Sequence, residues 1–426
     1  MWLPKRKYHH RRNKILHVSA ISPVVIFLII LCGCIAREST ELREALVLYR
    51  ENDLRHALPL FEEIVSQRTN DAEAHAWLAE TYRRLGMKDE AVRTASRALE
   101  LEQCNSFAHR VIADACRRPP GDPGQSESDT NWVHLNRAIT CDSTDGVAWV
   151  SVWNEAILRE KFDIMRKAVR KMKETGFLTK AALAYGRWML RTLPENAILI
   201  TTGDMDTFPA LAVQATEGFR ADVTVVERGL LGTKQFLHFI RDYVRIPLPL
   251  RDSHIDSLIE SADFPENISR VSSQIFKGWL DVRARDAFAH PLAIAVTVEE
   301  SFYTDIEGCL QYAGPFLLWR PTPSDSTPDT TALRVSLEGI RPEDFSGPWV
   351  STQDRSPVRI RYTKEIVRNI TLAALAYAEE LIQARRFTEA EKVLSWAEQF
   401  EEETELGPIH SERVSHLRGV AQRGRL

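Results

Sequence analysis

A repeat period of 34 residues is the feature that most restricts the fold of this chain. Small and large apolar side chains recur at helical spacing on both sides of a turn glycine, at Leu78, Ala79, Tyr82, Gly86, Ala91, Ala95 and Ala98. A shift of 34 residues places similar side chains on the same frame, at Ala45, Leu48, Asn52, Ala57, Phe61 and Ile64. One helix pair of this kind cannot bury its apolar face alone. The pattern therefore predicts a stack of helix pairs.

These positions are similar to those of the tetratricopeptide repeat, although His75 replaces its usual Trp and Gln103 its usual Pro. The frame predicts a third pair, interrupted by the turn-forming residues 117–131, and a degenerate fourth pair over residues 147–173. We expect tetratricopeptide-like repeats over residues 38–175. Their concave surface would bind a protein or peptide partner, but small residues at helical spacing are also what simple helix packing requires.

Short apolar runs replace the helical pattern after Asn196. Residues 197–202 and 223–227 are predicted as buried strands, and residues 210–219 between them as a helix. Such a β-α-β order makes the two strands parallel. With a third strand expected over residues 292–298, we predict an α/β domain over residues 182–335. The predicted fold class is α plus α/β.

The loop after the first of these strands, Gly203-Asp-Met-Asp-Thr-Phe-Pro209, carries two carboxylates at the strand end where α/β proteins place ligands. Asp204 and Asp206 could hold a divalent cation or act as acid and base. Alternatively, Asp206 or Thr207 caps the next helix, with Pro209 in its first turn, and Asp204 bonds loop amides. The residues favour the structural role, because no third ligand, His or nucleophile stands nearby. We therefore assign no catalytic residue, metal or cofactor.

Residues 183–400 resemble the soluble C-terminal region of bacterial membrane glycosyltransferase-like proteins, which are related to the animal transmembrane O-mannosyltransferase that modifies plexins and receptor tyrosine kinases. The resemblance is carried by residues 203–209, 217–223, 230–233, 290–298 and 313–321, and by Arg368-Asn369. Met205 and Gly232 depart from it, because the family often has Asn at both positions.

In that family the transfer chemistry resides in a many-helix membrane portion, whereas this sequence has a single apolar stretch, at its start. The resemblance thus implies an exported accessory or binding domain rather than a transferase. It also makes five residues ligand-binding candidates: Asp204, Asp206, Thr207, Arg220 and Asp222.

The N-terminal residues 1–34 are typical of an export signal. Six bases and no acid precede an apolar run that ends in Leu31-Cys-Gly-Cys34. That ending resembles a bacterial lipobox, which would make Cys34 the lipidated first residue of the mature protein. The alternative is an uncleaved anchor over residues 15–35. Either alternative predicts a protein anchored to a membrane of the cell envelope, facing the periplasm or exterior.

Removing those six bases leaves 49 Lys and Arg against 59 Asp and Glu, so the remaining chain carries a formal charge of −10. A chain with no general basic surface is not expected to bind nucleic acid. Cys104, Cys116, Cys141 and Cys309 are too scattered for a disulfide framework or a metal motif. One disulfide among the first three and four buried thiols are both compatible with the sequence.

The apolar spacing over residues 358–400 predicts a C-terminal tetratricopeptide-like helix pair, followed by a polar, partly disordered tail over residues 401–426. Three functions are compatible with these features. The first is a membrane-tethered scaffold for protein interactions. The second is a non-catalytic glycan-binding accessory to envelope or protein glycosylation. The third is a metal-dependent enzyme that uses Asp204 and Asp206.

Overall fold

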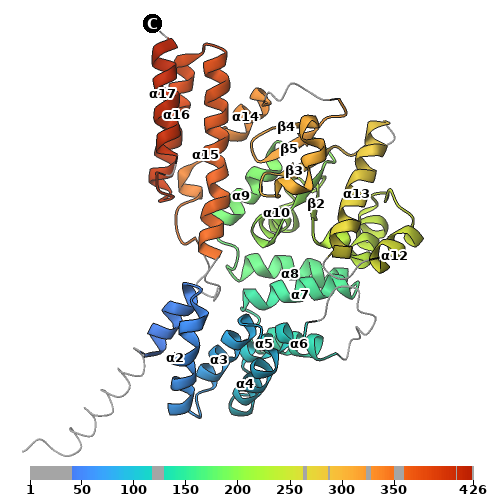
Figure 1. The fold of residues 1–426 in the computed structure, drawn as a ribbon, viewed down its shortest axis with the longest axis vertical. Coiled ribbons are helices and arrows are strands. Elements are labelled where there is room, and N and C mark those ends of the chain that lie inside the picture. Colours follow the sequence, from blue (N-terminus) through green and yellow to red (C-terminus); the bar gives the residue numbers. More distant parts are fainter. Residues whose placement is uncertain are drawn as a thin grey trace, which may run out of the picture.

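A computed structural model describes residues 41–117, 129–261, 266–285, 288–322, 328–349, 359–408 and 410–424. A repeat array occupies one end of the long axis of the molecule, and an α/β unit around a sheet and three C-terminal helices lie side by side beyond it (Figure 1). The predicted fold class is confirmed, with helical repeats, a small sheet that contains parallel strands, and helices at the end of the chain. The predicted export signal, including Cys34, lies outside the described residues.

The repeat array consists of consecutive helix pairs. The pairs are residues 41–50 with α2 (Leu54–Gln67), α3 (Ala72–Arg84) with α4 (Lys88–Leu101), α5 (Ser106–Ala115) with α6 (Thr130–Cys141), and α7 (Gly146–Leu158) with α8 (Phe162–Glu174). The alanines on the repeat frame are fully buried, as at Ala79, Ala91 and Ala95. Removal of these side chains from water is what holds neighbouring helices together.

Short polar side chains determine where three of these helices begin. Asp71, Asn105 and Asp145 each accept a hydrogen bond from the backbone amide three residues further on, at 2.9 to 3.1 Å. Each of them satisfies one of the amides that the first turn leaves without a helical partner. The first helix of each pair therefore starts at a fixed register relative to the pair before it.

The sheet of the α/β unit has five strands in the order β2-β1-β3-β5-β4. They are β1 (Ile198–Thr201), β2 (Thr224–Glu227), β3 (Leu292–Ala295), β4 (Leu310–Tyr312) and β5 (Phe316–Trp319). As predicted, β1 and β2 are parallel, and β3 joins the other side of β1, also parallel. The last two strands are antiparallel additions at the β3 edge.

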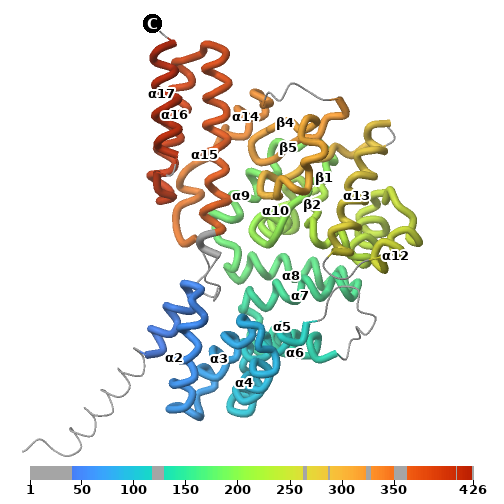
Figure 2. Tube along the Cα trace, viewed as in Figure 1, coloured from blue at the N-terminus to red at the C-terminus, as the bar shows by residue number. Residues whose placement is uncertain are grey.

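Helices surround this sheet, as the tube trace in Figure 2 shows. They are α9 (Lys180–Arg191), α10 (Asp204–Glu217), α11 (Lys234–His238), α12 (Asp252–Glu260), α13 (Glu266–Ala284) and α14 (Thr330–Leu337). Helix α9 crosses α10 so closely that a Cβ atom at Gly186 would lie 2.6 Å from the carbonyl carbon of Pro209. Only glycine fits there without moving the backbone of α10, which carries the acidic loop.

The C-terminal helices are α15 (Arg359–Gln383), α16 (Phe387–Glu403) and α17 (Ser411–Gly424). The prediction of a partly disordered tail after residue 400 was wrong, because α17 packs on α15 and α16. Its polar composition conceals an apolar stripe of Val414, Leu417 and Ala421, which is buried. Among all the described helices, none combines the length and the apolar character that crossing a membrane requires.

Candidate functional site

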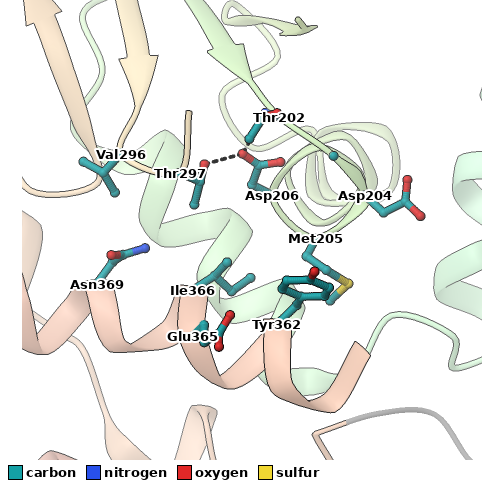
Figure 3. Close-up of a pocket in the computed structure, with 11 residues that line it drawn as sticks. Thr202, Asp204, Met205, Asp206, Val296, Thr297, Tyr362, Glu365, Ile366 and Asn369 are labelled. Atoms are coloured by element: carbon teal, nitrogen blue, oxygen red, sulfur yellow. Dashed lines mark hydrogen bonds between the residues drawn. The ribbon is translucent and has the colours of Figure 1, made fainter. Parts of the chain in front are cut away.

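A cavity of about 690 Å³ lies where the carboxyl ends of β1 and β3 face α15 (Figure 3). Its described lining residues are Thr202, Gly203, Asp204, Met205, Asp206, Val296, Thr297, Tyr362, Glu365, Ile366 and Asn369. Three separate segments supply them: the acidic loop, the segment after β3, and the first part of α15. The acidic loop predicted to lie at a strand end is therefore one wall of this cavity.

The strand order explains why a cavity forms here. From β1 the chain passes through α10 to β2 on one side, and β3 then occupies the other side of β1. The segments that follow β1 and β3 therefore leave the sheet in opposite directions. Crevices at such a switch point are the usual ligand sites of open α/β sheets.

Gly203 shapes the wall that carries the acidic loop. Its φ of 72° turns the chain directly from β1 into α10, so the helix begins at Asp204. The prediction that Asp206 or Thr207 caps this helix was therefore wrong, since the cap position is Gly203 and no side chain bonds there. The prediction that Pro209 lies in the first turn was also wrong, because the helix begins at Asp204 and Pro209 is its sixth residue. Asp206 is the third helical residue and reaches back to accept a hydrogen bond from the Thr202 amide at 3.0 Å.

Asp206 is the most enclosed carboxylate of the site, with only 1% of its surface exposed. The Thr297 hydroxyl donates to the same oxygen as the Thr202 amide, at 2.5 Å, and the Thr207 hydroxyl donates to the other oxygen at 3.3 Å. All three donors are neutral. Hydrogen bonds thus fix this side chain, and within the described ranges no cationic side chain contacts it.

Burial has a large effect on this group. It raises the pKa of Asp206 to about 7, and the nearby carboxylate of Glu227 raises it further, while the hydrogen bonds from Thr202 and Thr297 oppose the shift. Near neutral pH, both the protonated and the ionised form of Asp206 are therefore populated. Perturbed carboxyl groups in cavities are characteristic of functional sites, although structural networks perturb them too.

The other two predicted residues of the loop have different places. Thr207 is buried behind Asp206, and its hydroxyl lies 2.7 Å from that of Thr201 in β1. Asp204 borders the cavity, but its side chain points away from Asp206 (Figure 3). The described part of the chain contains no group of three or more His, Cys, Asp and Glu side chains that could hold a metal ion.

Arg220 and Asp222 lie far from the cavity, at the amino ends of β1 and β2 rather than at the carboxyl ends. The Arg220 guanidinium donates to Asp222 and to the backbone carbonyls of Leu190, Leu193 and Pro194 at 2.7 to 2.9 Å. Asp222 also accepts a hydrogen bond from the Asn196 amide, just before β1. This pair fastens the end of α9 to the start of both strands. The structure therefore does not bring all five candidates together, and these two have a structural role.

Sequence reasoning missed the residues that complete the cavity. Thr297 lies near the end of the strand predicted over residues 292–298, so its position close to a carboxyl end was a usable signal. Asn369 belongs to the Arg368-Asn369 segment of the family resemblance, and its amide donates to the buried Tyr185 hydroxyl at 3.4 Å. Nothing in the local sequence pointed to Tyr362 or Glu365. Their position depends on how α15 folds back over the sheet.

A second concentration of charge runs through the repeat array, mainly on the first helices of the pairs. Tyr49 donates to Glu80 at 3.2 Å, and Glu80 pairs with Arg83 at 2.7 Å. Hydrogen bonds or ion pairs also link six further polar side chains of the array: Asp114, Arg117, Ser151, Glu155, Arg159 and Asp129. We call these linked residues the charge ladder. Its buried acids are paired with arginine, which Asp206 is not.

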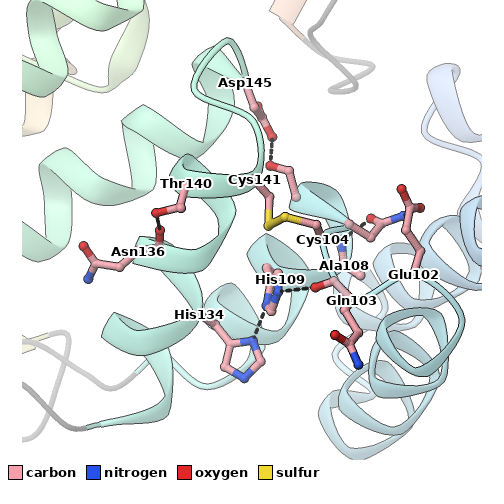
Figure 4. Close-up of a disulfide and its surroundings, with 12 residues drawn as sticks. Glu102, Gln103, Cys104, Ala108, His109, His134, Asn136, Thr140, Cys141 and Asp145 are labelled. Atoms are coloured by element: carbon pink, nitrogen blue, oxygen red, sulfur yellow. Dashed lines mark hydrogen bonds between the residues drawn. A yellow bond between two sulfur atoms is a disulfide. The ribbon is translucent and has the colours of Figure 1, made fainter.

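A disulfide joins Cys104, in the loop after α4, to Cys141, the last residue of α6 (Figure 4). The sequence left open whether these cysteines form one disulfide or remain thiols, and the structure has one disulfide. Cys116 and Cys309 are free thiols. Close to the disulfide, the Nδ1 atoms of His109 and His134 lie 2.9 Å apart. Burial lowers the pKa of both rings, to about 4 at His134. Such a contact needs at least one neutral ring, since two protonated rings would repel each other.

Two family models match this chain. One describes the tetratricopeptide repeat and matches residues 48–113, from the first helix pair to α5. The other describes TMEM260-associated domain 2 and matches residues 182–254, which include β1, the acidic loop, α10 and β2. No curated protein matches the chain. The matches agree with the repeat frame and with the family resemblance drawn from the GDMDTFP segment.

Proposed function

We propose that this protein is an exported, membrane-tethered scaffold that holds a protein partner on its repeat array. The observation that carries the proposal is the array itself, a stack of helix pairs that matches the tetratricopeptide family. Repeats of this family generally bind protein partners on an extended concave surface. Most of the charge ladder is buried, but its Arg117 side chain is 39% exposed and is a group of the array that such a partner could contact.

The Cys104–Cys141 disulfide supports the exported part of the proposal. Disulfides persist in oxidising compartments and are rare in the cytosol. The N-terminal residues 1–34 also support it, because they have the features of an export signal: a basic segment, an apolar stretch and Cys34.

Site-specific photocrosslinking in cells tests the scaffold role. A photoreactive residue placed at Arg84, at the end of α3, or at Arg117, just after α5, should give one discrete adduct with a partner. A photoreactive residue at Arg97 on α4, whose side chain is 45% exposed, serves as the control and should give none. Equal labelling from all three positions, or no adduct from Arg84 and Arg117, would contradict the proposal.

Labelling with radioactive palmitate tests the membrane tether. We expect the wild-type chain to incorporate label and the Cys34→Ser variant to incorporate none. An unlabelled wild-type chain that still sediments with membranes would replace the lipid with the uncleaved anchor over residues 15–35.

The match to TMEM260-associated domain 2 favours a second candidate function, a non-catalytic accessory to protein or envelope glycosylation that contacts glycan. This candidate predicts that deletion of the gene lowers the glycosylation of envelope proteins, whereas the scaffold role alone predicts an unchanged glycan profile. Mass spectrometry of envelope glycopeptides separates the two.

A further inference from the structure

The cavity at the carboxyl ends of β1 and β3 has a lining of unusual chemistry. It contains three carboxylate residues, Asp204, Asp206 and Glu365, and none of the described residues that line it is Lys, Arg or His. Such a lining disfavours phosphate, sulfate and carboxylate ligands, because none of its described side chains is a cation that compensates their charge. The described lining therefore suits a neutral or positively charged ligand.

The surroundings of Asp206 indicate whether this ligand is neutral or positively charged. Asp206 is 99% removed from solvent, it borders the cavity, and its partners are one amide and two hydroxyls. Buried carboxylates are normally paired with a cation, as Glu155 is in the charge ladder. At Asp206 none of the residues that the structure describes supplies this countercharge. The cavity wall is the side from which a ligand can supply it.

The remaining lining indicates what carries that positive charge. Met205, Val296 and Ile366 present apolar side chains, and the Tyr362 ring lies beside Met205 at the mouth of the cavity (Figure 3). Tyr362 is 51% exposed, which leaves an aromatic face accessible. Apolar walls fit a hydrocarbon stem, and an aromatic face attracts a cation. Fully hydrated metal ions gain nothing from such walls.

We propose that this cavity binds the primary ammonium group of a ligand with a short apolar stem, which Asp206 holds at the strand ends and Tyr362 covers at the mouth. The site is separate from the repeat array and goes beyond the scaffold role. Two sources offer this chemistry: a free diamine, or a lysine side chain of a polypeptide.

Calorimetric titration of the full-length chain tests the proposal with four probes that share a short hydrocarbon stem. These are 1,5-diaminopentane, Nα-acetyl-lysine methylamide, 1-pentanol and pentanoate. We expect the amines to bind and the alcohol and the acid to bind at least roughly tenfold more weakly, as a lost charge-assisted hydrogen bond predicts. Binding of the diamine alone indicates a free amine, and binding of both amines indicates lysine. Equal binding of pentanol or pentanoate, or no saturation by either amine, overturns the proposal.

Two variants locate the binding. Asp206→Asn keeps the size of the side chain but removes its charge, and should weaken amine binding roughly ten- to a hundredfold. Tyr362→Ala should weaken it by a smaller factor. Tyr362 is half-exposed, so this variant is expected to fold even where others do not. Tyr243→Ala, at a tyrosine that is 43% exposed and does not line the cavity, is the matched control. Unchanged amine binding in both Asp206→Asn and Tyr362→Ala would also overturn the proposal.

Discussion

Two regions of this molecule bury a carboxylate almost completely, and they balance its charge differently. In the repeat array, Glu155 lies between Arg159 and Arg117. In the α/β unit, Asp206 has only neutral hydrogen-bond donors. Burial raises the pKa of both groups, but the arginines oppose this at Glu155, whereas Glu227 adds to it at Asp206. The paired charge belongs to the architecture, and the unpaired one borders a cavity. Replacing each in turn should therefore give opposite results.

The largest effect is expected from Glu155→Ala. This change leaves the guanidinium of Arg159, which is only 5% exposed, without its closest partner. Breaking a buried ion pair on one side should lower the free energy of unfolding by about 4 kcal/mol in a urea titration. Glu174→Ala, which removes a 56% exposed partner of Lys171 on the same array, should cost less than about 1 kcal/mol. Similar losses in the two variants would show that the ladder does not depend on its buried pairs.

The second effect concerns the covalent link of the array. Replacing Cys104 and Cys141 together with Ser opens a loop of 37 residues and should cost about 3 kcal/mol. Thermal unfolding measured with and without a reductant checks this, because the reductant should lower the wild-type midpoint and leave the double variant unchanged. Cys116→Ser controls for the loss of a thiol. A wild-type unfolding midpoint that is the same with and without the reductant would contradict the Cys104–Cys141 disulfide.

The third effect has the opposite sign. Because the pKa of Asp206 is about 7 in the folded state and 3.8 is its ordinary value, the unfolded chain loses this proton first as the pH rises. The wild-type protein should therefore lose stability between about pH 4 and pH 7. Asp206→Asn removes that loss. Above pH 7 the Asp206→Asn variant should be more stable than the wild type by on the order of 2 kcal/mol. This gain is smaller than the full pKa shift of Asp206 implies, because a neutral amide accepts weaker hydrogen bonds than a carboxylate does.

Urea titrations at two pH values test this sign. The variant should gain stability over the wild type above pH 7 and show little gain near pH 4, where the carboxyl group is protonated in both states. A variant that is less stable than the wild type at the higher pH would mean that the charge of Asp206 is compensated within the fold, and the contrast with Glu155 would disappear.

The smallest effect is expected at the histidine contact of the array. The pKa of His134 is about 4 in the folded state, below its ordinary value of 6.5, so the unfolded chain binds this proton first as the pH falls. Stability from this group is complete above about pH 6.5 and declines toward pH 4. His134→Ala should make the thermal midpoint fall less steeply over this range than it does in the wild type. Identical slopes in the wild type and His134→Ala would contradict the shift.

The same contrast between the two regions separates what the sequence predicted from what it did not. Helix pairs such as α3 and α4 depend on residues within one 34-residue period, so their apolar spacing was sufficient. β1 and β2 were likewise predicted from local runs. Strands β4 and β5 are short antiparallel additions, and the family segment over residues 313–321 did not indicate their pairing. Helix α17 was missed because three apolar residues are spread among polar ones.

The candidate site was predicted in part for the same reason. The acidic loop was placed correctly at a strand end, because strand direction follows from chain order. Sequence could not show that Gly203 starts α10 early, which turns Asp206 inward instead of making it the cap. Nor could it show that Arg220 reaches back to the end of α9. The cavity also needs Asn369, more than 160 residues after Asp206, and no local pattern encodes that meeting.

The sheet order has a practical consequence for dividing this chain. The segment that matches TMEM260-associated domain 2 ends at residue 254, between β2 and β3. An expression boundary placed there would expose the β1 edge that β3 covers in the whole protein, and would also remove α15. Bare strand edges of this kind recruit other chains. The matched segment produced by itself should therefore aggregate, and a self-contained fragment has to run from α9 through at least α15.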